Sequence, residues 1–364
     1  MKINLPITGL SLGLLSALNA FGQGALTPPG APGPTMVTLS QIQPRTPISS
    51  VPFTISQPGS YYLTTNVTVS TGNAITISTN GVTLDLNGFT ISSTAASATG
   101  YGILINSGLR NLTIGNGFIQ GGVTNNGSGV YNGSGFSYGI AYSGSVPVNV
   151  LVSRISVSGC YNYGIYLYNG DSTVVEFCTV RTVGSFGIFA STIKQSSAVD
   201  CGASAIYGDQ VSDCRGQCSN VGYGVFGYLT QNCAGYSNSG TGLYAYTTAV
   251  NCYGYSYSYT GLDAVNALNS DGNSVNGSGL EAINAQNCYG YCSGSGSGYG
   301  IYADDAQNCF GSSGGSGDGI YVIYIASNCF GYCASGTGVN AFIANVCHGV
   351  GVTPLSTSHN IYSY

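Results

Sequence analysis

A short motif recurs along most of this chain at nearly constant spacing, and it restricts the possible folds more than any other feature. The motif is a small residue, then an aliphatic residue, then a residue that is often aromatic. The ten copies begin at Gly164, Gly187, Ala205, Gly224, Gly242, Gly261, Gly279, Gly300, Gly319 and Gly338. A repeat of about 19 residues is typical of solenoids, in which each repeat packs only against its neighbours.

A second series repeats in phase with the first and at nearly the same period, and Asn directly precedes six of its members. The series is Cys160, Cys178, Ser196, Cys214, Cys233, Cys252, Ser270, Cys288, Cys309, Cys329 and Cys347. We expect the Asn side chains to hydrogen-bond from one repeat to the next. The preferred interpretation of the cysteines is a column of buried thiols, because Ser replaces Cys twice and 13 is an odd number. The alternative is an occasional disulfide, such as Cys288 with Cys292 or Cys329 with Cys333.

The residues inside each repeat predict strands. Apolar and polar residues alternate, which is the period of a strand, and Gly-Ser and Asn-Gly clusters separate the alternating stretches. About 19 residues suit one coil of three short strands and three turns, with equivalent strands of successive coils about 4.8 Å apart. The aliphatic residue of each motif should face the core, and so should the small residue two positions later. Those small residues include Ala245, Ala264, Ala282, Ala303 and Ala341.

The remaining composition sets the domain boundaries and excludes some partners. All Lys and Arg lie at or before Arg215 and the net charge is −5, so we expect no nucleic-acid binding. Residues 1–22 have the pattern of a signal peptide, too short and too broken by Pro6 to span a membrane, which predicts a secreted or cell-surface protein. We predict a Pro/Gly-rich linker at 23–50, an N-terminal cap and first coils at 51–100, a β-helix at 101–347 and a C-terminal tail or cap at 348–364.

The repeats resemble the right-handed parallel β-helix, or pectin-lyase-like, superfamily over roughly residues 50 to 350. Pro52–Leu63, followed by Val82–Ile91, resembles the opening coils of bacterial secreted β-helix-repeat proteins. The resemblance implies an all-β, single-stranded right-handed parallel β-helix, a solenoid with coils of about 18–21 residues. Enzymes of this superfamily act on polysaccharides. Its lyases hold Ca²⁺ with carboxylates and use Lys or Arg as the base, and its glycosidases place carboxylates beside the scissile bond.

One column of outward residues contains the candidate site. It follows the aliphatic position and consists of Tyr166, Phe189, Tyr207, Phe226, Tyr244, Asp263, Glu281, Tyr302, Tyr321 and Asn340. Its seven aromatic residues are candidates for stacking on sugar rings. Asp263 and Glu281 should lie about 5 Å apart on successive coils, a spacing found between the two carboxyl groups of retaining glycosidases. Their proximity should raise one pKa.

Asp304 and Asp305 follow on the next coil, so Asp263, Glu281 and Asp304 are the catalytic candidates. All four acids together are equally consistent with a Ca²⁺ site, and we expect no other cofactor. A different interpretation is that the aromatic column only stabilises the sheet and that the acids reduce the non-specific association of this face with other molecules.

Two classes of function follow. The preferred one is a secreted or cell-surface solenoid with a structural, adhesive or glycan-contacting role, because charge is scarce and the steps between motifs from Gly187 onward are too even for long loops. The alternative is a polysaccharide lyase or glycoside hydrolase that uses the acidic cluster. A lyase would lack its base there, because no Lys, Arg or His lies on the nearby coils. Loops between Ile91 and Ser158 are the best candidates to cover a groove.

Overall fold

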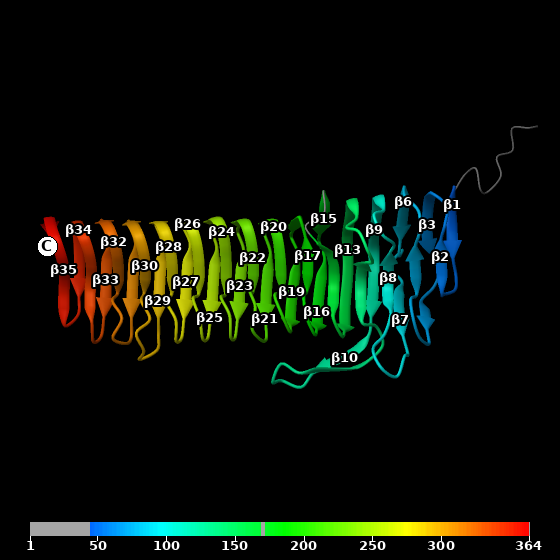
Figure 1. Ribbon diagram of the computed structural model, residues 1–364, viewed down its shortest axis with the longest axis horizontal. Helices are drawn as coiled ribbons and strands as arrows, with labels where there is room; N and C mark the ends of the chain where they lie inside the picture. The colour runs from blue at the N-terminus through cyan, green and yellow to red at the C-terminus, as the bar shows by residue number, and fades with distance from the viewer. Residues whose placement is uncertain (1–43, 169–171, 364) are drawn as a thin grey trace, which may run out of the picture. The chain divides into compact units, whose positions relative to one another are not determined.

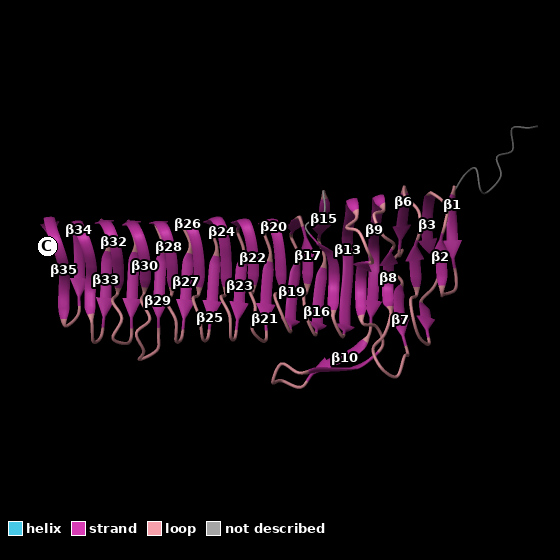
Figure 2. Cartoon of the chain, in the orientation of Figure 1, coloured by secondary structure: helices cyan, strands magenta, loops and turns pink. Residues whose placement is uncertain are grey.

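The computed structural model describes residues 44–168 and 172–363, which contain strands and loops but no helix (Figures 1 and 2). Met1–Pro44 and Arg45–Tyr364 are two separate units. The expected signal peptide, and the expected linker up to residue 43, lie outside the described residues. The strands from Arg45 onward form a right-handed parallel β-solenoid of about 16 turns, which confirms the predicted fold class.

The strands are as follows. The first coils contain β1 (Arg45–Ile48), β2 (Phe53–Ile55), β3 (Gly59–Leu63), β4 (Val67–Val69), β5 (Ile75–Ile77), β6 (Val82–Asp85), β7 (Thr90–Ser93), β8 (Tyr101–Ile105), β9 (Arg110–Gln120), β12 (Tyr138–Tyr142) and β13 (Val148–Cys160). The middle coils contain β14 (Tyr163–Tyr168), β15 (Thr173–Glu176), β16 (Thr179–Val183), β17 (Ile188–Ala190), β18 (Thr192–Lys194), β19 (Ser197–Cys201), β20 (Ile206–Ser212), β21 (Arg215–Cys218), β22 (Val225–Gln231) and β23 (Ala234–Ser237). The last coils contain β24 (Leu243–Val250), β25 (Tyr253–Ser256), β26 (Leu262–Leu268), β27 (Asp271–Ser274), β28 (Leu280–Gln286), β29 (Tyr289–Cys292), β30 (Ile301–Gln307), β31 (Phe310–Ser313), β32 (Ile320–Ser327), β33 (Phe330–Cys333), β34 (Thr337–Val350) and β35 (Thr353–Ser363). A separate antiparallel hairpin consists of β10 (Gly122–Asn125) and β11 (Tyr131–Ser134).

The coil that contains β26 and β27 shows how each repeat is built. Leu262 is fully buried and is in register with Leu243 and Leu280 on the neighbouring coils. Ala264 and Ala267 are also buried although they are three positions apart, so β26 bends between them and contributes to two faces of the solenoid. The other predicted inward alanines are buried as well, except Ala282, which is partly buried against the core. The alternation of apolar and polar residues therefore predicted the core correctly.

Two columns of glycine bring the backbones of two faces into contact across each coil. A Cβ atom added to Gly272 would overlap the carbonyl oxygen of Gly279, where the next coil begins, and Gly254 has the same relation to Gly261. The pattern recurs from Gly216 to Gly331, so no side chain fits between the two faces at this level. The abundance of glycine, 57 residues, thus follows in part from the narrow cross-section of the coils.

The turn after each long strand from β22 to β32 contains an Asn of the predicted column. Asn269, Asn287 and Asn308 have φ values of 49°, 54° and 54°, a left-handed conformation that Asn tolerates better than most residues. The amide of Asn287 donates to Asn269 at 3.0 Å, and that of Asn308 donates to Asn287 at 3.1 Å. The expected hydrogen bonds between coils are therefore confirmed.

The cysteines form the expected column of buried thiols. All 13 are free and buried, including those for which a disulfide was the alternative. The thiols of Cys214 and Cys233 each donate at 3.1 Å to the carbonyl oxygen two residues earlier. Ser196 and Ser270 make the same hydrogen bond at 2.7 and 2.8 Å, which explains why Ser replaces Cys in this column. Burial raises the pKa of the Cys160 thiol to about 12, so this thiol stays protonated.

The solenoid extends further at both ends than the sequence predicted. Arg45–Ile48, assigned to the linker, form β1, which pairs with β3, and Arg45 forms an ion pair with Asp85 at 2.6 Å. At the other end, residues 348–350 complete β34, and residues 353–363 form β35, which pairs in parallel with β34. The residues assigned to a tail or cap thus continue the stack of coils. These strands were missed because they lack the Gly-aliphatic motif of the central repeats.

Candidate functional site

The predicted outward column exists as one continuous line of register partners. Tyr166 pairs with Phe189, and the series continues through Tyr207, Phe226, Tyr244, Asp263, Glu281, Tyr302, Tyr321 and Asn340. Several of its rings stack on the ring of the next coil. The centroid distances and interplanar angles are 4.1 Å and 9° for Tyr207–Phe226, 5.5 Å and 11° for Phe226–Tyr244, and 5.4 Å and 2° for Tyr302–Tyr321.

Stacking makes much of this column unsuitable for sugars. Rings that stack from coil to coil turn their faces toward each other and their edges toward solvent, whereas a pyranose packs on a ring face. Phe189 and Phe226 are in addition only 6 % and 8 % exposed. These two residues, predicted to bind glycan, are therefore part of the packed surface. Their neighbours Phe186 and Tyr223 contact them and help to cover them.

The column is interrupted at Asp263 and Glu281, and the interruption produces a hollow. Tyr244 stacks on Phe226 on the side away from the acids, and Tyr302 stacks on Tyr321 on the opposite side. The faces of Tyr244 and Tyr302 that look toward the acids are thus not used by stacking within the column. The hollow has a volume of about 230 Å³ and is lined by Tyr244, Ala245, Tyr246, Asp263, Ala264, Val265, Glu281, Ala282, Ile283, Tyr302 and Asp304.

Two adjacent acids are part of the lining of the hollow. Asp263 and Glu281 are direct register partners on β26 and β28. Burial, and then the negative charge of Glu281, raise the pKa of Asp263 to about 6. The neighbouring charge acts in the expected direction on this pKa, but burial is the larger cause. No Lys, Arg or His is among the residues that line the hollow, so no cation compensates these charges there.

The other two predicted acids lie where the coil bends. Asp304 lines the hollow beside Asp263 and Glu281 and is half-buried. Asp305 is in register with Asn284 and accepts a hydrogen bond from the backbone N–H of Ile325 at 3.1 Å. Within residues 44–168 and 172–363, no three Asp, Glu, His or Cys side chains are grouped as a metal site requires. The Ca²⁺ site predicted from all four acids is therefore not assembled, because Asp305 lies past the bend.

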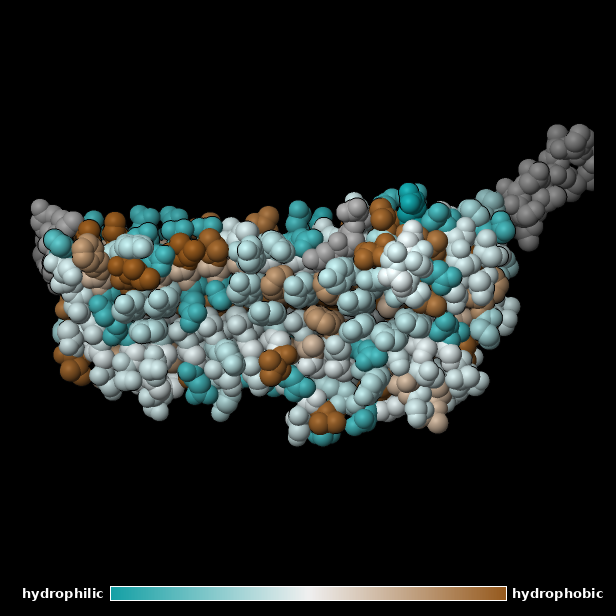
Figure 3. Space-filling view, viewed as in Figure 1, coloured by the Kyte–Doolittle hydropathy of each residue, from teal (hydrophilic) through white to brown (hydrophobic). Residues whose placement is uncertain are grey.

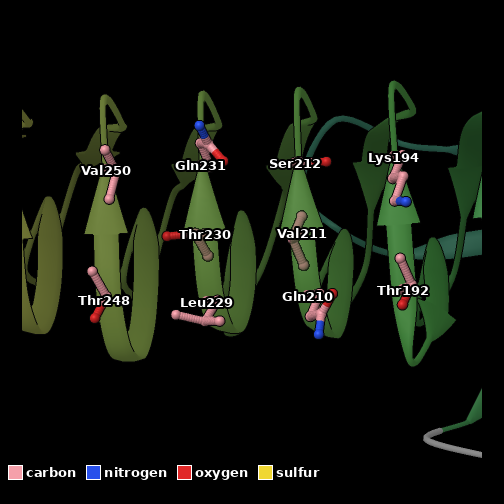
Figure 4. A pocket seen from close by; sticks show the side chains of 10 residues that line it. All are labelled: Thr192, Lys194, Gln210, Val211, Ser212, Leu229, Thr230, Gln231, Thr248 and Val250. Carbon is pink, nitrogen blue, oxygen red and sulfur yellow. The ribbon is translucent and has the colours of Figure 1, made fainter.

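A second groove crosses four coils on another face. Figure 4 shows Thr192, Gln210, Leu229 and Thr248 in one row and Lys194, Ser212, Gln231 and Val250 in the next. The groove has a volume of about 310 Å³, and Lys194 is its one titratable side chain. It offers amides, hydroxyls and methyl groups but no pair of catalytic groups, so we regard the hollow at Asp263 as the candidate site.

The irregular region between Ile91 and Ser158 contains the hairpin of β10 and β11, which runs beside the stacked coils in Figure 1. Asp200 on β19 holds it in place. One carboxylate oxygen of Asp200 accepts hydrogen bonds from the side chains of Asn125 and Tyr131 at 2.6 and 2.9 Å, and from Ser219 at 3.1 Å. The other oxygen accepts from Thr182 at 2.9 Å. The hairpin is thus attached to neighbouring coils, and the half-buried Asp200 is engaged through both carboxylate oxygens in fixing it.

Replacing Asp200 with Asn should release the hairpin. Burial raises the pKa of Asp200, but its hydrogen bonds outweigh this and lower the pKa overall, so the native state favours the ionised form. Loss of the charge should cost about 1–2 kcal/mol at neutral pH. Tyr131, now 7 % exposed, should become a site of rapid chymotrypsin cleavage, measured by limited proteolysis. Asp213→Asn is the control, and equal cleavage of both variants would contradict this role of Asp200.

The sequence prediction missed a second aromatic ladder on another face. Tyr289, Phe310, Phe330 and His348 stack in turn, with all three centroid distances at 5.2 Å. A signal was present, since each of these residues directly follows a Cys of the second repeat series. Asp271 precedes Tyr289 in the same column. Asp200 was also missed, and no local pattern marks it.

On the face shown in Figure 3, most of the surface is of intermediate hydropathy, and hydrophobic and hydrophilic residues are interspersed, in keeping with the abundance of Gly and Tyr. Across the described ranges, the structure contains no helix that could cross a membrane.

Comparison with known proteins yields one result. No family model and no curated protein matches the chain. Among solved structures, the chain is similar to the A-module of the mannuronan C-5 epimerase AlgE4 of Azotobacter vinelandii. The sequences are 12 % identical, the alignment covers 84 % of this chain and 91 % of that chain, and the TM-score is 0.36. The assignment of this chain to the parallel β-helix fold therefore rests on its own strand register.

Proposed function

We propose that this protein is a secreted or cell-surface solenoid that binds a glycan in the hollow between Tyr244 and Tyr302. The observation that carries the proposal is the interruption of the stacked column, which leaves one face of each of these rings free of stacking within it. Both rings line the hollow, together with the carboxyl groups of Asp263 and Glu281. Ring faces combined with a few polar groups are the usual composition of a small-ligand site.

The dimensions of the interruption suit sugar rings. Tyr244 and Tyr302 are three coils apart, which corresponds to about 14 Å along the stack. A pyranose unit inserted into the hollow would place an apolar ring face against one of the tyrosines and its hydroxyl groups near the two carboxylates. Carboxylates are strong acceptors for such hydroxyls. The open shape of the hollow allows an oligosaccharide that crosses the stack of coils to continue on either side of the column.

Removing the two rings should abolish most of the binding. In a screen of oligosaccharides followed by calorimetry, we expect the Tyr244→Ala, Tyr302→Ala double variant to lose at least ~10-fold in affinity, since each ring-face contact is worth about 1 kcal/mol. Tyr257→Ala is the matched control, because Tyr257 is 54 % exposed and does not line the hollow. If no glycan binds the native protein, or if the double variant keeps the native affinity, the proposal is wrong.

Glycoside hydrolysis is the second candidate function. Asp263 has a pKa of about 6 and lies on the coil next to Glu281, at a separation of about 5 Å expected for adjacent strands. A protonated Asp263 can act as the acid and Glu281 as the nucleophile. Release of reducing sugar from a bound glycan, lost in the Asp263→Asn, Glu281→Gln variant, would establish this activity over binding alone. Lyase chemistry has no basic residue in the lining of the hollow.

A further inference from the structure

We infer that the hollow between Tyr244 and Tyr302 selects glycans that carry free amino groups and rejects polyuronates. This inference rests on the proposed glycan binding and names its substrate class. Three kinds of observation support it: the ring faces, the acids beside them and the distribution of charge over the coils that surround the hollow.

The lining of the hollow is suited to an ammonium group. Asp263, Glu281 and Asp304 line one small depression, and no Lys, Arg or His lines it. The rings of Tyr244 and Tyr302 flank these groups, and a tyrosine face attracts a cation within about 6 Å of its centroid. An amino sugar presents both parts of the matching ligand, an apolar ring face for the tyrosines and an ammonium group for the carboxylates. A neutral sugar forms only the weaker hydrogen bonds between hydroxyl and carboxylate.

The charge of the surrounding coils also favours a cationic glycan over an anionic one. Residues 216–364 contain six acids and no Lys or Arg, so this part of the chain has a formal charge of −6 from those residue types. The acids are Asp263, Asp271, Glu281, Asp304, Asp305 and Asp318. A uniform negative field attracts a polycation and repels a polyanion from a distance. The negative charges of these coils would repel a chain of uronic acids as it approached. In the hollow, the carboxylates of the uronic acids would also face those of Asp263 and Glu281.

The ring faces favour an amino sugar over a basic peptide as the occupant. The faces of Tyr244 and Tyr302 that are not used by stacking within the column look along the stack of coils, so each can accept the flat apolar face of a pyranose inserted into the hollow. A lysine side chain can place its ammonium group against the carboxylates and a ring face, but it has no flat apolar face to stack on the tyrosines.

The test compares three hexasaccharides of equal length that differ in charge. Native protein is titrated at pH 6.5 and low salt with glucosamine hexamer, N-acetylglucosamine hexamer and galacturonic acid hexamer. We expect the glucosamine hexamer to bind at least ~10-fold more tightly than its acetylated form, and the galacturonic acid hexamer not to bind. The Asp263→Asn, Glu281→Gln variant should lose this preference. Asp271→Asn should keep it, because Asp271 lies on another face of the same coil and does not line the hollow.

The outcomes separate this inference from the proposed function. If the two hexamers of the glucosamine series bind equally, and both depend on Tyr244 and Tyr302, glycan binding stands and selection for amino groups is wrong. Tight binding of galacturonic acid hexamer also overturns the inference. If none of the three binds while a lysine hexapeptide does, both the inference and the proposed glycan binding fail.

Discussion

Replacing Gly272 with Ala is expected to lower the free energy of unfolding by about 3 kcal/mol or more. The new methyl group would overlap the carbonyl oxygen of Gly279, which belongs to the backbone of another face of the solenoid, at the start of the next coil. Backbone cannot rotate away as a side chain does, so the two faces must separate. That separation would disturb the register with the coils on either side, because each coil is stabilised mainly by its neighbours.

Gly296→Ala is the matched control for this substitution. A Cβ atom at Gly296 meets nothing within 4 Å, so we expect its free energy of unfolding to change by less than about 0.5 kcal/mol. Urea denaturation followed by circular dichroism measures both variants. Gly254→Ala should behave like Gly272→Ala, because its Cβ would overlap the carbonyl oxygen of Gly261. A native-like midpoint for Gly272→Ala would show that the two faces are not held in contact.

Replacing Asp263 with Asn is expected to stabilise the fold at neutral pH. The pKa of Asp263 is raised from 3.8 to about 6, so ionisation of this group is easier in the unfolded chain than in the folded one. The native protein therefore loses stability as pH rises from about 4 to about 6, and the loss remains above pH 6. Asn carries no charge and escapes this loss. After allowance for solvent screening, we expect a gain of about 1–2 kcal/mol at pH 7.5 and no gain at pH 4.

Thermal unfolding at a series of pH values measures this effect. Asp200→Asn provides the contrast, because the pKa of Asp200 is lowered in the folded protein and its ionised form contributes stability above the unfolded pKa. At pH 7.5 the two substitutions should therefore shift the melting temperature in opposite directions, and at low pH both shifts should shrink. A melting temperature of Asp263→Asn equal to or below the native value at pH 7.5 would contradict the assignment of Asp263 as a destabilising acid.

The combination of stability and binding data distinguishes a binding acid from an incidental one. A residue kept for ligand contact commonly costs the fold some stability. Asp263→Asn should thus gain stability and lose affinity for the amino-sugar hexamer in the same preparation. If the acid only reduces non-specific association of the sheet, its replacement by Asn should raise the stability without changing the affinity for the hexamer.

Much of the candidate site could be predicted from the sequence. The period of the Gly-aliphatic motif placed Asp263 next to Glu281 and both between tyrosines, and the strand register agrees at every position from Tyr166 to Asn340. This succeeded because a parallel solenoid converts equal steps along the chain into direct neighbours in space. The same logic predicted the Asn column and the buried thiols.

The sequence by itself determined the strand period, the in-register stacking and the pairing of Asp263 with Glu281, since these depend only on repetition. Only the tertiary structure decided which parts of the column are accessible. Phe189 and Phe226 are covered by Phe186 and Tyr223, aromatic residues that precede the motif glycine on only some of the coils. Asp305 is separated from the other acids by a bend between two faces. Asp200 depends on a hairpin that lies far earlier in the chain. Contacts of this kind arise from the way the coil closes in three dimensions, which a repeat period does not encode.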